Sequence, residues 1–388
     1  MTPRRLKSGE RISLLLAAVV LAAFWIAVGT FAVREASRHD FLSFYTGARL
    51  AAEGRWGDLY DAGAQRAIQD SIVPGLPSLV PYIRPPVYAL LVSPLAALEF
   101  ATALKLWLAV QIILYCAIGF WIRRRYSEEG LLYWALFMPG AAGIMHGQDS
   151  TMILAVAAAG LILSERGRPA VAGLVWSLLF VKFHICAGLA LALLAGRKSR
   201  QLTGFAIGGA LLASVSIALV GAPGAGSYAA MLTSDNLDRL NPAPQKMTNI
   251  LGMLAAAGID SAWTALLAGI VVVGAMTAAA WKAPMWRVLS AGLAGGILIA
   301  PHAYIYDVTA LLLPLVIAVQ PDQPRSLRIA AFLLIAPVIP MMSLAQPPWS
   351  VLPALAVAAL LAVLAATRRA RLETVPVTAC EAVRPAAG

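Results

Sequence analysis

Residues 166–200 read RGRPAVAGLVWSLLFVKFHICAGLALALLAGRKSR, an apolar run that is interrupted at Lys182, Phe183 and His184 and has basic residues at both ends. Lys and Arg in short loops favour the cytoplasmic side of a membrane. One helix across the run would bury Lys182 and place its two basic ends on opposite sides. Two short helices keep both ends in the cytoplasm and place Lys182 and His184 at the outer tip, which avoids a costly charge inside the membrane. The stretch therefore predicts a hairpin of membrane helices.

The same alternation of basic clusters and apolar segments recurs along the whole chain. If all the clusters are cytoplasmic, each stretch between them crosses the membrane an even number of times. The clusters lie at 4–11, 123–125, 166–168, 197–200, 282–287, 325–328 and 368–371. The apolar segments lie at 12–33, 101–122, 130–146, 150–164, 169–181, 184–195, 202–220, 262–281, 288–300, 304–320, 327–344 and 350–366. The pattern predicts an all-α polytopic membrane protein with about twelve transmembrane helices in six outward hairpins.

The composition excludes several classes of protein. Of the 388 residues, 60% are hydrophobic and 13% are charged, and the mean hydropathy is +0.77, which excludes a soluble globular or a disordered chain. The net charge of +11 is divided among short loops beside apolar segments. That distribution indicates membrane orientation and contact with lipid headgroups rather than binding of nucleic acid. The three cysteines lack a metal-ligand spacing, so neither a zinc site nor another metal is predicted.

One transmembrane domain accounts for most of the chain. The first apolar segment is too long for a signal peptide and lacks a clear cleavage site, so it predicts an uncleaved membrane helix. The predicted parts are a cytoplasmic N-terminus at 1–11, the transmembrane domain at 12–371 with external loops at 34–100 and 221–260, and a disordered cytoplasmic tail at 372–388.

The first external loop contains two short apolar stretches. After Asp40, apolar residues recur at helical spacing as far as Gly54, which predicts a short amphipathic helix on the membrane surface with Asp40 near its N-cap. Residues 85–98 are apolar but contain three prolines, which favours a re-entrant or interfacial helix over a span.

Ionisable residues gather at the predicted outer tips. Asp40 at a helix start suits a general base that accepts a proton from a hydroxyl, and it equally suits a helix cap. His302, in the sequence PHAYIYD at 301–307, suits phosphate binding or the orientation of a base. The tyrosines of that sequence equally suit an interfacial aromatic belt.

Cationic and amide side chains occupy three further tips. Lys182, with His184 beside it, would neutralise a phosphate diester, although a lone Lys commonly snorkels to the interface. Arg84 on a stiff Pro-Pro turn suits a phosphate clamp. Gln148 and Asp149, in His146-Gly147-Gln148-Asp149, hydrogen-bond sugar hydroxyls well, or simply form a polar turn between helices.

Taken together, these motifs resemble those of the polyprenyl-phosphate-sugar-dependent glycosyltransferases of family 87. The resemblance extends over about residues 20–320 and keeps the order of the motifs. The motifs are Asp40-Phe41-x-x-Phe44-Tyr45-x-x-Ala48 with Gly54, Tyr60-Asp61, Pro85-Pro86 with Ser93-Pro94-Leu95, Gly147-Gln148, Lys182, and Pro301-His302-Ala303-Tyr304-x-Tyr306-Asp307. Asp149 and Phe183 depart from the family pattern, where Asn and Pro are frequent.

The resemblance implies a GT-C-type helical bundle in the cell membrane, with an active site that faces outward. It implies an inverting hexosyltransferase that moves a hexose from a polyprenyl-phosphate donor to a glycolipid or glycan acceptor. Mannose is the hexose that the resemblance favours, and no cofactor is expected. By motif position Asp40 would be the catalytic base and His302 its partner. Lys182, Arg84 and His184 would bind the donor phosphate. The residues expected to bind the sugar or the acceptor are His146, Gln148, Asp149, Tyr306 and Asp307.

Two other classes of protein remain as alternatives. A multi-pass transporter of an envelope lipid or sugar also suits about twelve helices, but transporters place polar groups near the midplane on broken helices in paired repeats. A non-catalytic membrane scaffold would have no reason to bring Asp40, Lys182 and His302 to one pocket. A shared pocket for these three residues would therefore argue against the scaffold, and their depth in the membrane would separate an enzyme from a transporter.

Overall fold

The computed structural model describes residues 40–126, 128–233 and 243–373, together with Ala23, Ile26 and Thr30. Within these residues helices make up 79% of the structure and there is no strand, which confirms the all-α prediction. The α-helices of the first half are α2 (Phe41–Ala52), α3 (Ala62–Ile72), α4 (Pro86–Val92), α5 (Phe100–Arg125), α6 (Glu128–Ala135), α7 (Met138–Met145), α8 (Ser150–Glu165), α9 (Pro169–Trp176) and α10 (Phe183–Ala195). Those of the second half are α11 (Ser199–Thr233), α13 (Ile250–Ala256), α14 (Ala262–Ala280), α15 (Met285–Ile299), α16 (Leu312–Ala318), α17 (Arg325–Ile335), α18 (Val338–Met341) and α19 (Leu352–Glu373). Short 3₁₀ helices are η2 (Trp56–Asp58), η3 (Ser93–Ala97), η4 (Ser177–Val181), η5 (Pro244–Lys246), η6 (Ile305–Leu311), η7 (Met342–Leu344) and η8 (Trp349–Val351).

Four helices in the described residues are long and apolar enough to cross a membrane. A fifth span results if α17 and the segment from α18 to η7, which are bent by 46° relative to each other, count as one. The other apolar helices have 10–17 residues, short of the roughly 20 that a straight span needs. The predicted helix at 12–33 falls outside the described residues except for Ala23, Ile26 and Thr30. The structure thus supports a membrane protein, and the figure of about twelve spans stays a prediction.

The hairpin was predicted from an interruption of the apolar run at Lys182, and the structure has a break between helices at that residue. The helical stretch formed by α9 and η4 ends at Val181, and α10 begins at Phe183. Lys182 lies at this break and is buried within the protein, 2% exposed, and its position at the outer tip of the hairpin stays a prediction. Its ammonium group pairs with the carboxylates of Asp149 and Asp307, and these charges offset the cost of burial that the prediction sought to avoid.

Helix α2 corrects the prediction of an amphipathic helix on the membrane surface. Its residues Phe41 to Ala48 are all buried, because α3, α4, η3 and α5 pack around it. Both sides of the helix carry apolar residues, with Phe41 on one and Leu50 on another, so the sequence supplies two faces to bury. The predicted end is correct, because the helix stops at Ala52 and Gly54 follows with a φ of 70°, a left-handed conformation that suits glycine.

The stretch at 85–98 forms α4 and η3, together a short apolar helical segment, and the preference for a re-entrant or interfacial helix stays a prediction. Helix α11 differs from the prediction of a loop from residue 221, because it continues to Thr233 after a kink. The kink lies at Gly221, whose φ of 68° and ψ of −179° are not helical. Pro223 then falls in the first turn of the resumed helix, where a missing N–H costs nothing.

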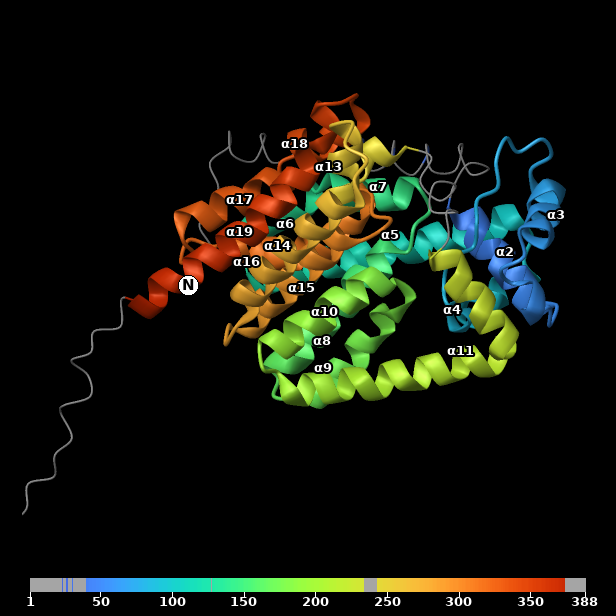
Figure 1. The fold of residues 1–388 in the computed structure, drawn as a ribbon, viewed down its shortest axis with the longest axis horizontal. Coiled ribbons are helices and arrows are strands. Elements are labelled where there is room, and N and C mark those ends of the chain that lie inside the picture. Colours follow the sequence, from blue (N-terminus) through green and yellow to red (C-terminus); the bar gives the residue numbers. More distant parts are fainter. Residues whose placement is uncertain are drawn as a thin grey trace, which may run out of the picture.

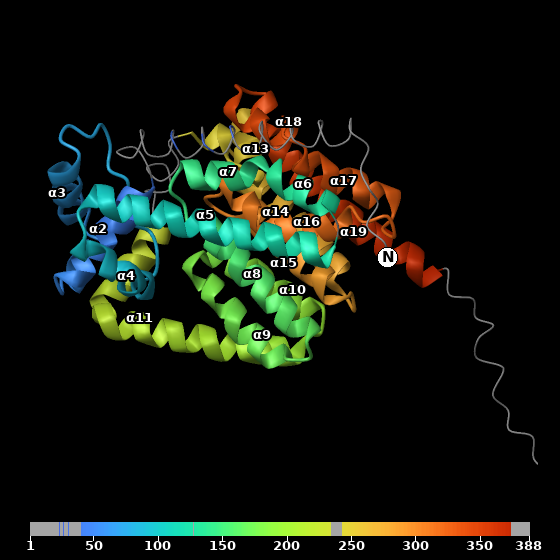
Figure 2. The ribbon, with the colours of Figure 1, turned by 180° about the vertical axis from the view of Figure 1, so that it is seen from behind.

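Helices α2, α3 and α4 lie together at one end of the molecule (Figure 1). Helices α8, α9 and α10 form one group, α11 extends along its edge towards α4, and α14 to α19 form a second group. Helix α5 runs across the molecule from the α2–α4 end, as the view from behind shows (Figure 2). The two groups meet where α10 packs on α15, and Gly188 allows this close approach because a Cβ there would collide with the backbone of Gly292 and Gly296.

Candidate functional site

Side chains from five separate parts of the sequence line one cavity of about 530 Å³, part of it open to solvent. Eight of the ten predicted site residues belong to its lining. They are Asp40, Arg84, Gln148, Lys182, His184, His302, Tyr306 and Asp307. Asp149 lies directly behind this lining, buried and in contact with Arg84. His146 does not line the cavity, since its side chain is exposed and its ring lies 5.9 Å from that of Tyr306.

Several of these residues sit at the start of a helix. Asp40, Asp149 and Lys182 occupy the N-cap positions of α2, α8 and α10. The N-terminus of a helix carries a partial positive charge and unpaired backbone N–H groups. Three helices therefore add positive potential at or beside the cavity, which favours an anionic ligand.

Asp40 directs its carboxylate away from its own helix. The side chain makes no capping hydrogen bond to α2, and its Oδ2 instead accepts a hydrogen bond from Gln148 Nε2 at 2.6 Å. The backbone N–H of Asp40 donates to the carbonyl of His146 at 3.2 Å and so ties the start of α2 to the end of α7. The capping interpretation of Asp40 is therefore wrong for its side chain.

A tight turn between α7 and α8 presents Gln148 and Asp149. Gly147 adopts a φ of 63°, and its carbonyl accepts a hydrogen bond from Trp107 Nε1 at 2.9 Å. The backbone N–H of Gln148 donates to the carbonyl of Gly143 at 2.9 Å. These contacts fix the turn on two neighbouring helices and set the direction of both polar side chains.

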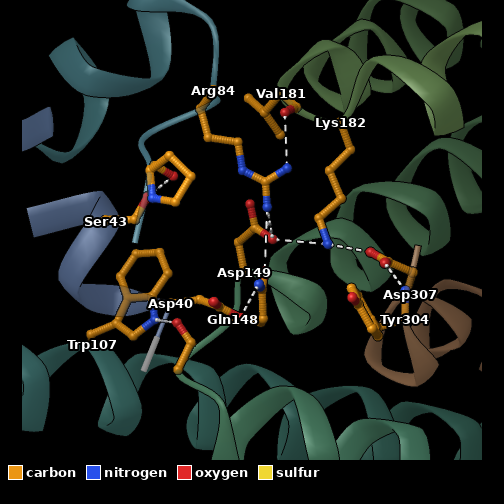
Figure 3. Close-up of polar contacts among 12 residues, drawn as sticks. Asp40, Ser43, Arg84, Trp107, Gln148, Asp149, Val181, Lys182, Tyr304 and Asp307 are labelled. Atoms are coloured by element: carbon orange, nitrogen blue, oxygen red, sulfur yellow. Dashed lines mark hydrogen bonds and ion pairs between the residues drawn. The ribbon is translucent and has the colours of Figure 1, made fainter. Parts of the chain in front are cut away.

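Arg84 connects three parts of the site (Figure 3). Its Nη2 donates to Asp149 Oδ1 at 3.0 Å and to Gln148 Oε1 at 3.3 Å, and its Nη1 donates to the carbonyl of Val181 at 3.3 Å. The guanidinium also lies 5.3 Å from the ring centre of Phe44, within range of a cation–π interaction. Arg84 is 8% exposed, so its position is set by the protein rather than by solvent.

Lys182 lies between two carboxylates. Its Nζ is 3.2 Å from Asp149 Oδ1 and forms a second ion pair with Asp307 Oδ1. The other oxygen of Asp307 accepts a hydrogen bond from the backbone N–H of Tyr304 at 2.9 Å. Arg84, Asp149, Lys182 and Asp307 thus form a continuous buried chain of alternating charge, as Figure 3 shows.

His302 lies in a loop that is anchored by residues of the second half. Asn249 Nδ2 donates to the carbonyl of Ala300 at 2.9 Å, and the N–H of Thr248 donates to the carbonyl of Ala303 at 2.8 Å. Burial lowers the pKa of His302 below its usual 6.5, although Asp307 and Asp40 oppose this shift. The neutral imidazole is therefore the favoured form near neutral pH.

Two nitrogen atoms at the cavity are buried without a hydrogen-bond partner in the described part of the chain. They are Arg84 Nε and His184 Nε2. Buried polar atoms are normally satisfied, so such atoms in a cavity point to a ligand. In residues 40–126, 128–233 and 243–373 there is no group of three His, Cys, Asp or Glu side chains placed to hold a metal ion.

The cavity also includes residues that the motifs did not mark as site residues. Ser43 lies three residues after Asp40, hence on the same face of α2, and its hydroxyl donates to the carbonyl of Pro81 at 3.0 Å. Helical spacing from Asp40 was therefore a usable signal for Ser43. Val80 and Ile83 belong to an extended segment before α4, and no pattern in the sequence distinguishes them.

Comparison with known proteins gives one finding. The sequence model of glycosyltransferase family 87 matches residues 82–301, which is more than half of the chain. No curated protein and no solved structure matches. The match includes Arg84, Gln148 and Lys182, whereas Asp40 and His302 lie outside it and reach the same cavity through the fold.

Proposed function

Since the chain belongs to glycosyltransferase family 87, we propose that it transfers a hexose from a polyprenyl-phosphate donor to a glycolipid or glycan of the cell envelope. Mannose is the hexose that we propose. The observation that carries this proposal is the cavity itself. It brings a carboxylate, Asp40, and two cations, Arg84 and Lys182, together from distant parts of the sequence. These are the side-chain types that transfer from a phosphate-linked sugar requires.

Arg84, Lys182 and His184 form the phosphate-binding end of the proposed site. Arg84 and Lys182 already pair with Asp149 and Asp307, so a phosphate meets cations that are fixed in place. Arg84 Nε and His184 Nε2 are buried at the cavity without a hydrogen-bond partner among the described residues, which leaves them for the phosphate oxygens. Preorganised donors of this kind stabilise the charge that develops on a leaving phosphate.

Asp40 is the base of the proposed reaction, and His302 helps to orient it. The acceptor hydroxyl gives its proton to the Asp40 carboxylate while its oxygen forms a bond to the anomeric carbon. The bond between that carbon and the phosphate oxygen breaks, and polyprenyl phosphate leaves with the electron pair. Attack opposite the leaving group inverts the anomeric configuration, and the scheme consumes no cofactor.

The geometry narrows the set of residues proposed for the sugar and the acceptor. Tyr306 lines the cavity and offers a hydroxyl, whereas the amide of Gln148, which also lines it, is already bonded to Arg84 and Asp40. Asp149 and Asp307 are committed to cations, so their proposed role becomes that of holding Arg84 and Lys182. His146 lies outside the cavity lining and is not proposed as a sugar ligand.

We further propose that the cavity faces outward from the cell membrane, within a bundle of about twelve helices of GT-C type. The seven basic clusters between apolar segments support that orientation. No geometric observation favours the transporter alternative.

The test is transfer by the Asp40→Asn variant of the purified protein. The assay uses synthetic polyprenyl-phosphate hexoses carrying mannose, glucose or galactose, with extracted envelope glycolipid as acceptor. Asn keeps the size and accepts the hydrogen bond from Gln148 but lacks the basic carboxylate. We expect transfer to fall by a factor of about 10²–10⁴, while the melting temperature stays close to that of the wild type.

Asp58→Asn is the matched control, because Asp58 is exposed and pairs only locally with Arg55 at 2.8 Å. We expect it to keep wild-type transfer. An Asp40→Asn protein that works at the normal rate would remove Asp40 from the reaction. A wild-type protein that transfers none of the three sugars would remove the polyprenyl-phosphate hexose donor.

A further inference from the structure

We propose that Gln148 is the positioning residue of Asp40 and that Arg84 sets the orientation of its amide. The three side chains form a continuous line from the proposed phosphate end of the cavity to the proposed base. Gln148 Oε1 accepts from Arg84 Nη2 at 3.3 Å, and Gln148 Nε2 donates to Asp40 Oδ2 at 2.6 Å. This inference rests on the proposed function and gives Gln148 a role other than binding sugar.

The charges at its two ends allow only one orientation of the amide. In the orientation described, a cation faces the amide oxygen and a carboxylate faces the amide N–H₂. The reversed amide would turn its oxygen towards Asp40 and its N–H₂ towards Arg84, so two attractive contacts would become two repulsive ones. Arg84 therefore selects the amide orientation that presents a donor to Asp40.

The backbone at Gln148 is also held by specific hydrogen bonds. The backbone of Gln148 is held by Gly143, and the preceding Gly147 is held by Trp107. Gln148 is 6% exposed, and both ends of its amide are held by hydrogen bonds to charged partners. A side chain fixed at its base and at both ends of its amide is suited to positioning a second residue rather than to following a substrate.

The line from Arg84 through Gln148 to Asp40 affects both the proton-accepting carboxylate and the phosphate-binding cation. The hydrogen bond from Gln148 engages Oδ2 of Asp40, so we assign acceptance of the acceptor proton to Oδ1. Hydrogen bonds in a chain polarise one another, and the positive charge of Arg84 makes the amide N–H a better donor. Binding of a phosphate at Arg84 is therefore felt at Asp40 through one amide group.

The decisive variant is Gln148→Glu, which keeps the length and shape of the side chain. It replaces the donor that faces Asp40 with a second carboxylate, and two carboxylates at this separation share a proton. The measurement is kcat/KM between pH 5 and pH 9, with whichever of the three polyprenyl-phosphate hexoses the wild type uses best. We expect the acidic limb of the profile to move up by about one pH unit or more.

Gln201→Glu is the matched control. Gln201 is a partly buried glutamine whose Nε2 donates to Ser164 Oγ at 3.0 Å, outside the cavity lining. The same change of charge there is expected to leave the pH profile unchanged. An equal shift in both variants would show a general effect of charge and would overturn the inference.

Gln148→Met provides a second measurement that does not introduce a charge. It keeps the length of the side chain but removes both hydrogen bonds. We expect kcat to fall by about 10–100-fold, the range for a lost hydrogen bond to a charged group, with the donor KM nearly unchanged. A raised donor KM with an unchanged kcat, together with a Gln148→Glu profile like that of the wild type, would make Gln148 a sugar ligand only.

The Asp40→Asn variant separates this inference from the proposed function. If Asp40→Asn is inactive and the Gln148 variants behave like the wild type, only the positioning role fails. If Asp40→Asn is fully active, the proposed base fails, whatever Gln148 does.

Discussion

Asp40 and Asp307 line the same cavity and are held in opposite ways. Asp307 is 3% exposed and lies against the ammonium group of Lys182 and the backbone N–H of Tyr304. Asp40 is partly exposed, and the hydrogen bond to its carboxylate comes from a neutral amide, that of Gln148. A carboxylate paired with a buried cation is a poor proton acceptor, whereas one held by a neutral donor stays available to a hydroxyl. The difference supports the proposal that Asp40 is the base and that Asp307 holds Lys182 in place.

The two environments also differ in what their removal costs. Breaking a buried ion pair from one side leaves an uncompensated charge in a medium that solvates it poorly. Among the residues that the structure describes, no Lys or Arg pairs with Asp40, so it has no such cation to lose. Variants at the Asp307 end should therefore act on stability first, and variants at the Asp40 end on transfer first.

The largest stability effect is expected for Lys182→Met. Methionine fills a similar volume, but Asp307 loses its cation and remains buried. We expect the free energy of unfolding in detergent to fall by about 3–5 kcal/mol, the range for breaking a buried pair from one side. The measurement is thermal or denaturant unfolding of the purified variant beside the wild type.

The double variant Lys182→Met with Asp307→Asn sharpens this prediction. It removes the stranded charge together with its partner, so we expect it to recover a large part of the lost stability. If the double variant is as unstable as the two single losses added together, the pair does not act as a unit, and the contrast with Asp40 disappears.

A smaller effect is expected at His302 when the pH is lowered. Burial lowers its pKa below 6.5 in the folded protein, so the unfolded chain takes up a proton first as the pH falls. The stability that comes from the neutral imidazole is therefore present above pH 6.5 and is lost progressively below it. The charged groups that act on this ring are Asp307, Asp40, Arg84 and Lys182.

We expect the melting temperature of the wild type to drop between pH 7.5 and pH 5.5, and that of His302→Gln to drop less. The comparison is of slopes with pH, so a constant offset in stability between the two proteins does not matter. Equal slopes in the two proteins would mean that the protonation of His302 is not linked to folding.

The sequence predicted those parts of the fold that depend on local patterns. The helix break at Lys182 and the left-handed glycine after α2 follow from charge and from backbone geometry near one residue. The position of α2 was predicted wrongly, because only tertiary packing reveals that α4 and α5 cover the faces that a membrane surface was expected to cover. The resumption of α11 beyond Gly221 was missed because glycine and proline there read as a loop, whereas they form a kink.

The sequence predicted which residues form the candidate site but not which of them pair with one another. The motifs identified Arg84, Gln148 and Lys182 as candidate site residues, and the structure brings them to one cavity. The sequence alone could not predict which carboxylate pairs with which cation. Asp149 and Asp307 lie far apart in the chain, and only the fold brings both to Lys182. Asp149 therefore read as a sugar ligand, although its Oδ1 is shared by two buried cations.

The most direct test of the whole account is a cryo-electron-microscopy structure of the Asp40→Asn variant with a polyprenyl-phosphate hexose bound. We predict that the phosphate lies within hydrogen-bond distance of Arg84 Nε and His184 Nε2. The anomeric carbon should lie between the phosphate and residue 40, with residue 40 on the side opposite the leaving oxygen. A donor bound away from this cavity, or a phosphate that faces residue 40 instead of Arg84, would contradict the central claim.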